Sequence, residues 1–233
     1  NPVTLPVAAS DLVAWYPFRS GTGEDITAGD SNFGDTTDYS ATVNGASFKP
    51  DSGVHDIQNG ANSGAFDLDG TDDTIDLGTV ADSDQSLTIM SWVKVDTVSK
   101  SKAQRVITKR DLSDQSGTLI LDVDNSSPRF FVNDGSFVNV IASSDASVGV
   151  FFHMAGRYDF SAGKMTIFFN GQPEATASVG QAVPFSGQPF RIGQEKQLSG
   201  ADNFLDGTVD GARIYTAALS DSQINQIYLN TKP

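Results

Sequence analysis

The sequence predicts an all-β fold of antiparallel strands, either a sandwich or a barrel, with one short helix near its C-terminal end. Between residues 65 and 171, short runs rich in β-branched and aromatic residues alternate with turn residues. This spacing is typical of antiparallel sheets. The 233 residues need not be divided, because all-β sandwiches commonly occupy roughly 200–250 residues as one unit.

The first forty residues differ from the rest in composition. Residues 1–10 contain two prolines and small side chains, so we expect a linker or an edge segment before a single domain at 11–233. A strand-like run begins at Asp11 and ends near Pro17. Residues 21–40 are almost entirely polar and form a long connection, and loops of this length often bind ligands or metals.

Three local patterns define individual elements. Residues 87–95 alternate with the two-residue period of a strand and carry apolar side chains on both faces, which predicts a central strand. Asn170-Gly171 is a strong two-residue hairpin turn, because both residues accept a positive φ at little cost. Ser220 and Gln223 match a capping box, and an apolar face of Ile224, Ile227 and Tyr228 follows.

Composition excludes several kinds of partner. The net charge of −14, with only 15 Lys and Arg, argues against nucleic acid, which is bound through clustered basic residues, and against an anionic membrane surface. No apolar stretch approaches the ~20 residues of a membrane helix. The absence of Cys removes disulfides and thiolate metal sites. The excess of Asp, Ser, Thr, Gly and Asn over Lys favours a secreted or cell-surface protein.

Carboxylates are concentrated in a few short segments. Five lie within ten residues around the Gly70-Thr71 turn, two flank Gly207, and one lies in the long polar connection: Asp67, Asp69, Asp72, Asp73, Asp76, Asp206, Asp210 and Asp38. Carboxylates at this density repel one another, and a bound divalent cation would offset the repulsion. We therefore expect Asp38, Asp69, Asp72, Asp73, Asp206 and Asp210 to include calcium ligands. The alternative is that these acids are simply solvated on strand faces.

A resemblance to a known family rests on motifs spread over the whole domain. The motifs are Leu12–Phe18, Phe66–Asp73, Ser91–Lys94, His153–Asp159, Phe169–Gly171 and Arg191–Gly193. In this order they resemble the strands of bacterial laminin G-like, concanavalin A-like domains and of the related pentraxins. The resemblance implies a jelly-roll sandwich of two antiparallel sheets and calcium-dependent binding. The pentraxin disulfide is missing and residues 20–40 are longer than in the family, so pentameric assembly is not implied.

The resemblance also implies a ligand-binding rim. The segment 108–115 takes the place of a pentraxin loop that supplies Asp and Asn ligands, which identifies Asp111 and Asp114 as candidates. A second such loop corresponds to Gln194, Glu195 and Gln197, although Gln197 stands where the family has an acid. Two aromatic residues in or beside loops, Tyr39 and Phe204, are the candidates for stacking on a sugar ring.

Catalytic patterns are weak by comparison. Sandwich glycosidases need two carboxylates about 5–9.5 Å apart, usually from a Glu-x-Asp-x-x-Glu strand, and none of Glu24, Glu174 and Glu195 lies in such a strand. His153 lies in a strand-like run, where we expect a hydrogen-bonded structural role. The sequence thus favours a non-catalytic, calcium-stabilised module that binds a polysaccharide or glycan, as part of a larger secreted enzyme or a surface adhesin. A polysaccharide lyase or glycoside hydrolase, and a structural or protein-binding spacer, remain the alternatives.

Overall fold

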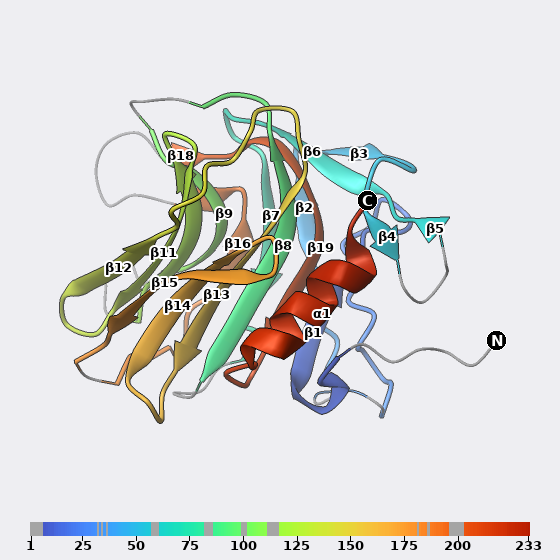
Figure 1. Cartoon of the computed structure of the whole chain (residues 1–233). Helices are drawn as coiled ribbons and strands as arrows, with labels where there is room; N and C mark the ends of the chain where they lie inside the picture. The colour runs from blue at the N-terminus through green and yellow to red at the C-terminus, as the bar shows by residue number, and fades with distance from the viewer. Residues whose placement is uncertain are drawn as a thin grey trace.

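Two antiparallel sheets pack face to face in a computed structural model of the chain (Figure 1). The structure describes residues 7–31, 33, 35, 37–56, 61–81, 86–98, 102–110, 117–180, 182–185, 187–195 and 203–233. Its strands form two large sheets and two small two-stranded ones, and its one α-helix lies near the C-terminal end. This is the jelly-roll sandwich with a short C-terminal helix that we expected.

The eight-stranded sheet has the order β15-β14-β13-β8-β19-β6-β3. The eighth strand, β1, pairs with the C-terminal half of β19, whereas β6 pairs with its N-terminal half. The strands are β1 (Leu12–Tyr16), β3 (Ser47–Lys49), β6 (Ala65–Asp69), β8 (Leu87–Val95), β13 (Phe152–Asp159), β14 (Lys164–Phe169), β15 (Gln172–Ser178) and β19 (Asp206–Tyr215).

The seven-stranded sheet has the order β12-β11-β10-β9-β16-β7-β2. Its strands are β2 (Thr42–Asn44), β7 (Thr74–Gly78), β9 (Gln104–Lys109), β10 (Leu119–Asp124), β11 (Ser127–Asn133), β12 (Phe137–Ile141) and β16 (Phe190–Ile192). The two small sheets pair β4 (His55–Asp56) with β5 (Ala61–Asn62), and β17 (Gln194–Glu195) with β18 (Asn203–Phe204).

Strand β8 shows how the sequence period builds two apolar layers. Ile89 and Val93 point into the main core between the sheets, whereas Met90 belongs to a second buried cluster on the outer face of the same sheet. β8 pairs with β13 on one side and β19 on the other, so the prediction of a central strand is confirmed.

Helix α1 (Asp221–Thr231) covers that outer face (Figure 1). The predicted capping box is confirmed, because Ser220 accepts from the Gln223 N–H and the Gln223 side chain accepts from the Ser220 N–H. Ile224 and Ile227 are buried, and Tyr228 stacks on Trp92 with 5.6 Å between ring centroids. Within the described residues, no helix is both long and apolar enough to span a membrane.

Two turns fix the geometry around the ends of the strands. Asn170 and Gly171 join β14 to β15 with φ of 47° and 77°, so the predicted hairpin is confirmed. The segment Asp69–Asp73 connects β6 in the eight-stranded sheet to β7 in the seven-stranded sheet. It therefore bridges the two layers at one end of the sandwich and places its carboxylates there.

Candidate functional site

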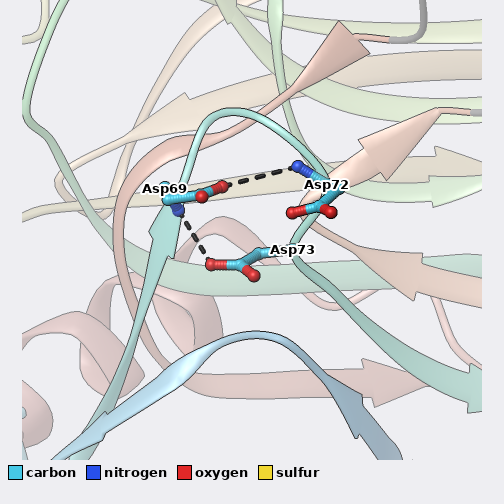
Figure 2. A group of neighbouring side chains, drawn as sticks. All are labelled: Asp69, Asp72 and Asp73. Carbon is cyan, nitrogen blue, oxygen red and sulfur yellow. Dashed lines mark hydrogen bonds between the residues drawn. The ribbon is translucent and has the colours of Figure 1, made fainter.

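Three carboxylates gather on the turn that bridges the two sheets. Asp69 ends β6, and Asp72 and Asp73 precede β7. Figure 2 shows the three side chains around this turn, and one oxygen from each lies within 4.8 Å of the others. Asp69 and Asp72 are exposed, whereas Asp73 is buried. The sequence prediction of an acidic group at this turn is thus matched by a real spatial cluster.

Backbone hydrogen bonds hold the carboxylates in place. Asp69 Oδ1 accepts from the N–H groups of Thr71, at 2.8 Å, and Asp72, at 3.4 Å. Asp73 Oδ2 accepts from the Asp69 N–H at 3.0 Å. These bonds use one oxygen of Asp69 and one of Asp73. The second oxygen of each, and the whole Asp72 carboxylate, accept no hydrogen bond from the described residues.

Electrostatics at this cluster favour a cation. Burial raises the pKa of Asp73, and the nearby charges of Asp69, Asp72 and Asp67 raise it further, although the hydrogen bond from the Asp69 N–H lowers it. Three carboxylates in close proximity supply only hard oxygen donors, which is the ligand chemistry of calcium. The residues therefore fit a calcium ion, which the backbone carbonyls of the turn and water would have to complete to six to eight oxygens.

A neighbouring glycine shows how tightly Asp73 is enclosed. Gly45, in the turn between β2 and β3, has a φ of 81°, and a Cβ added there would lie 1.9 Å from Asp73 Oδ1. Only glycine fits this approach. The β2–β3 turn thus closes over one side of the acidic turn.

A pocket of about 210 Å³ opens beside the acidic turn, and we call it the acidic pocket. Its described lining comes from three connections between strands and from the strand ends beside them: Asp69, Gly70, Thr97, Lys102, Gln104, Phe204 and Asp206. Asp69 therefore belongs both to the carboxylate cluster and to the pocket wall. The half-buried ring of Phe204 is the aromatic part of the wall, and Lys102 is exposed.

Hydrogen bonds from distant segments position Asp206 in this wall. Thr97 Oγ1 donates to Asp206 Oδ2 at 2.6 Å, and the Asp206 N–H donates to Gln104 Oε1 at 2.9 Å. Gly70 lies directly against Asp206, because a Cβ on Gly70 would be 2.8 Å from the Asp206 Cβ. Thr97, Lys102 and Gln104 were not predicted, because no motif marks them. Thr97 is brought to Asp206 by the pairing of β8 with β19, and Gln104 reaches it from β9 in the other sheet.

The predicted ligand rim is only partly described. Asp111, Asp114 and Gln197 lie outside the described residues. Gln194 and Glu195 form β17, and Gln194 faces Phe204 across the small β17–β18 sheet. The backbone of Glu195 pairs with Asn203, and its side chain lies outside what the structure describes. Phe204, the predicted stacking residue, lines one pocket together with Asp69 and Asp206.

Asp38 and Tyr39 lie elsewhere in the long polar connection. Asp38 is exposed and accepts from the N–H and the hydroxyl of Ser40, and the Ser40 hydroxyl bond chiefly lowers its pKa. It does not belong to the carboxylate cluster. The Tyr39 hydroxyl donates to Asp35 at 2.8 Å, and its ring is half-buried against the main core. Neither residue lines the acidic pocket.

Asp210 is closed off by the protein itself. It is fully buried at a bulge in β19, where its Oδ2 accepts from the Val54 N–H at 2.7 Å and from the Ser63 hydroxyl at 2.5 Å, and its Oδ1 from the Gly211 N–H at 2.5 Å. Burial raises its pKa to about 7 despite these bonds. Because both oxygens already accept hydrogen bonds, this arrangement argues against Asp210 as a calcium ligand.

His153 is buried in the layer beneath α1. Its ring contacts Trp92 and Tyr228, with centroids 5.4 Å and 6.2 Å away. Burial, together with the positive charge of Arg213, lowers its pKa to about 3. The expectation of a hydrogen-bonded histidine is wrong, because neither ring nitrogen has a hydrogen-bond partner among the described residues. It remains a structural residue, packed between aromatic rings.

Solved structures of several binding domains share this fold. Domain 4 of a GH43 extracellular arabinanase from Geobacillus stearothermophilus, solved in complex with arabinotriose, is 18% identical with a TM-score of 0.69, and the match covers 94% of this chain and 98% of that one. The receptor-binding domain of botulinum neurotoxin D is 13% identical with a TM-score of 0.68, covering 97% of this chain and 57% of that chain. At these identities the similarity concerns the fold alone.

A pentraxin is also similar, as the motifs in the sequence indicate. The heptameric SAP-like pentraxin from Limulus polyphemus is 16% identical with a TM-score of 0.55, covering 70% of this chain and 80% of that chain. No curated protein matches the chain by sequence. The family model described as the concanavalin A-like lectin/glucanases superfamily matches residues 69–225, which is well over half of the chain. The chain therefore belongs to the concanavalin A-like lectin/glucanases superfamily.

Proposed function

We propose that the chain is a carbohydrate-binding module that calcium stabilises, carried by a secreted polysaccharide-degrading enzyme or a surface adhesin. The observation that supports this most is the double position of Asp69, which shares the carboxylate cluster with Asp72 and Asp73 and lines the acidic pocket with Phe204. Because one residue belongs to both, the cation would order the wall that contacts the ligand.

In this proposal the calcium ion is held by Asp69, Asp72 and Asp73, and it offsets their repulsion. The ring of Phe204 stacks on the apolar face of a sugar, as aromatic rings do with flat apolar surfaces. Lys102 donates hydrogen bonds to sugar hydroxyls, and the carboxylates of the wall accept them. The pocket volume of about 210 Å³ is below the ~300–1,000 Å³ usual for drug-sized ligands, so it suits one sugar unit or a chain end.

The comparisons support this ligand class without establishing it for this chain. The arabinanase domain was solved in complex with arabinotriose, and one botulinum neurotoxin D domain of 15% identity was solved in complex with N-acetylneuraminic acid. The arabinanase is extracellular, which accords with the secreted or surface location that the composition favours.

A carbohydrate array tests the proposal directly. We expect the intact chain to bind at least one glycan in calcium and to bind more weakly in excess chelator. Phe204→Ala removes the stacking ring and should weaken binding by about tenfold, which corresponds to about 1.4 kcal/mol. Glu195→Ala removes a carboxylate of the ligand rim that the family resemblance implies, and it should also weaken binding. Phe137→Ala is the control, because Phe137 is exposed on β12 and does not line the pocket.

Two results would overturn the proposal. If glycan binding is unchanged both in Phe204→Ala and in the wild type with excess chelator, the acidic pocket is not the ligand site. Release of reducing ends or of unsaturated products from a polysaccharide panel, lost in Asp206→Asn, would make the chain a hydrolase or lyase instead.

A further inference from the structure

A second pocket of about 330 Å³ opens at the opposite end of the sandwich, and we call it the distal pocket. The register of β8 shows the separation, because Val95 at its end faces Gly207 beside the acidic pocket, and Leu87 at its start faces Tyr158. The described lining belongs to the β13–β14 turn and to the segment after β15: Tyr158, Phe160, Ser161, Ala162, Gly163, Val179, Gly180 and Ala182.

The β13–β14 turn is held in one conformation by hydrogen bonds. The carboxylate oxygen Oδ1 of Asp159 accepts from the Ser161 hydroxyl at 2.7 Å and from the Ala162 N–H at 3.0 Å. The N–H of Phe160 donates to the hydroxyl of Ser86 at 3.0 Å. The wall that carries Phe160 is thus ordered before any ligand arrives, which reduces the entropy cost of binding.

The opposite wall is fixed to both sheets. The Val179 N–H donates to the Gly163 carbonyl at 2.8 Å, which ties this segment to the β13–β14 turn. The Gly180 N–H donates to Asp134 Oδ2 at 2.7 Å, and Asp134 lies in the turn between β11 and β12 of the seven-stranded sheet. The floor is closed by Tyr158, whose ring packs edge-on against Phe185 at 5.3 Å.

The chemistry of the lining is amphipathic and uncharged. Phe160 is 47% exposed, although exposing an aromatic ring to water is unfavourable. Ser161 offers a hydroxyl, and Ala162, Gly163, Gly180 and Ala182 are small enough to leave backbone groups accessible. None of the described lining residues is charged. The carboxylates of Asp134 and Asp159, which accept hydrogen bonds from the wall residues, would repel an anionic ligand.

We propose that the distal pocket is a second carbohydrate site, which binds one neutral sugar unit stacked on Phe160. A sugar ring combines an apolar face with a hydroxyl perimeter, which matches one exposed aromatic ring surrounded by hydroxyl and backbone hydrogen-bonding groups. The ligand class rests on the function proposed above. The site itself is inferred from the pocket. With two sites, the module could contact one polysaccharide chain twice, and the second contact would form more readily because the tethered chain is at a high effective concentration.

Amide chemical shifts of the isotopically labelled full chain distinguish the two sites. The probes are the neutral trisaccharides arabinotriose, xylotriose and cellotriose and the anionic trisaccharide of galacturonic acid. We expect at least one neutral probe to shift the amides of Phe160, Gly163 and Gly180, with Phe160→Ala weakening that response about tenfold. Phe160→Trp should retain it, and Phe137→Ala, which alters a ring 51% exposed on β12, should leave it unchanged.

Each outcome identifies which proposal fails. Shifts at Gly70, Thr97 and Phe204 without shifts at the distal amides would overturn the distal site and leave the proposed function intact. Distal shifts alone would retain the distal site and overturn the acidic pocket as the ligand site. Stronger binding of the galacturonic acid trisaccharide at the distal amides, an unchanged response in Phe160→Ala, or no response to any probe would overturn the proposal of a neutral sugar site.

Discussion

The acidic turn and Asp210 both present carboxylates, but they differ in how many hydrogen bonds those carboxylates accept. At the turn, an oxygen from each of Asp69, Asp72 and Asp73 lies within 4.8 Å of the others, and some of the carboxylate oxygens accept no hydrogen bond from the described residues. Asp210 is alone and buried, and both of its oxygens accept hydrogen bonds. Whether a carboxylate is a candidate cation ligand therefore depends on the hydrogen-bond donors that the fold places around it, as well as on the density of acids in the sequence.

Position along one strand explains part of the difference. Asp206 and Asp210 are four residues apart on β19, so their side chains leave the same face of the sheet. Asp206 lies at the start of the strand and lines the acidic pocket. Asp210 lies at the bulge, beneath the segment that contains Val54 and Ser63, which donate to it. Water reaches the first carboxylate and is excluded from the second.

Asp210→Asn should produce the largest effect on stability. The amide nitrogen would place a donor against one of the donors that now bind the carboxylate, which costs about 1–3 kcal/mol. At ~2–4 °C per kcal/mol for a chain of this size, the Tm should fall by several degrees. Thermal unfolding measures this change, with the exposed Asp51→Asn as the control for charge. An unchanged Tm in Asp210→Asn, or loss of the Tm response to calcium in that variant, would contradict the distinction between Asp210 and the acidic turn.

The pH dependence of stability should separate His153 from Asp210. The pKa of His153 is about 3 in the folded chain, below its ordinary value of 6.5, so its contribution to stability is present above pH 6.5 and is lost as the pH falls through 3. The pKa of Asp210 is raised to about 7, so its contribution has the opposite sign and is lost as the pH rises through 7. The two groups oppose each other in weakly acidic solution.

His153→Phe isolates the histidine contribution, because it removes the titration and retains an aromatic ring between Trp92 and Tyr228. Denaturant midpoints measured from pH 7 to pH 4 should decline less steeply in this variant than in the wild type. His55→Gln is the control, since His55 is only half-buried. Parallel curves for His153→Phe and the wild type would contradict a buried neutral His153.

Much of the fold could be predicted from the sequence, because its signals are local. The alternation in residues 87–95, the Asn170-Gly171 turn and the Ser220 capping box each depend on neighbours along the chain, and each is confirmed. The assignment to two sheets came from the order of motifs in the family, because strand pairing between distant segments leaves no local pattern.

The site was harder to predict than the fold, because most of its contacts join residues that are far apart in the sequence. The cluster of Asp69, Asp72 and Asp73 is local and was among the acids predicted from spacing, although Asp38, Asp206 and Asp210 were predicted with it. The acidic pocket is not local, since Thr97 and Gln104 reach Asp206 from more than one hundred residues away. The closure of Asp210 by Ser63 also depends on a distant contact, across 147 positions of sequence.

Thermal unfolding with and without calcium tests the central claim most directly. For the metal-free wild type, calcium at 100 times its Kd should add about 2.7 kcal/mol, or a rise in Tm of several degrees over the value in excess chelator. Asp72→Asn should lose most of this rise, whereas Asp38→Asn, an exposed acid outside the cluster, should retain it. Identical melting curves in calcium and in chelator for the wild type, or a rise that survives in Asp72→Asn and disappears in Asp38→Asn, would contradict calcium binding at the acidic turn.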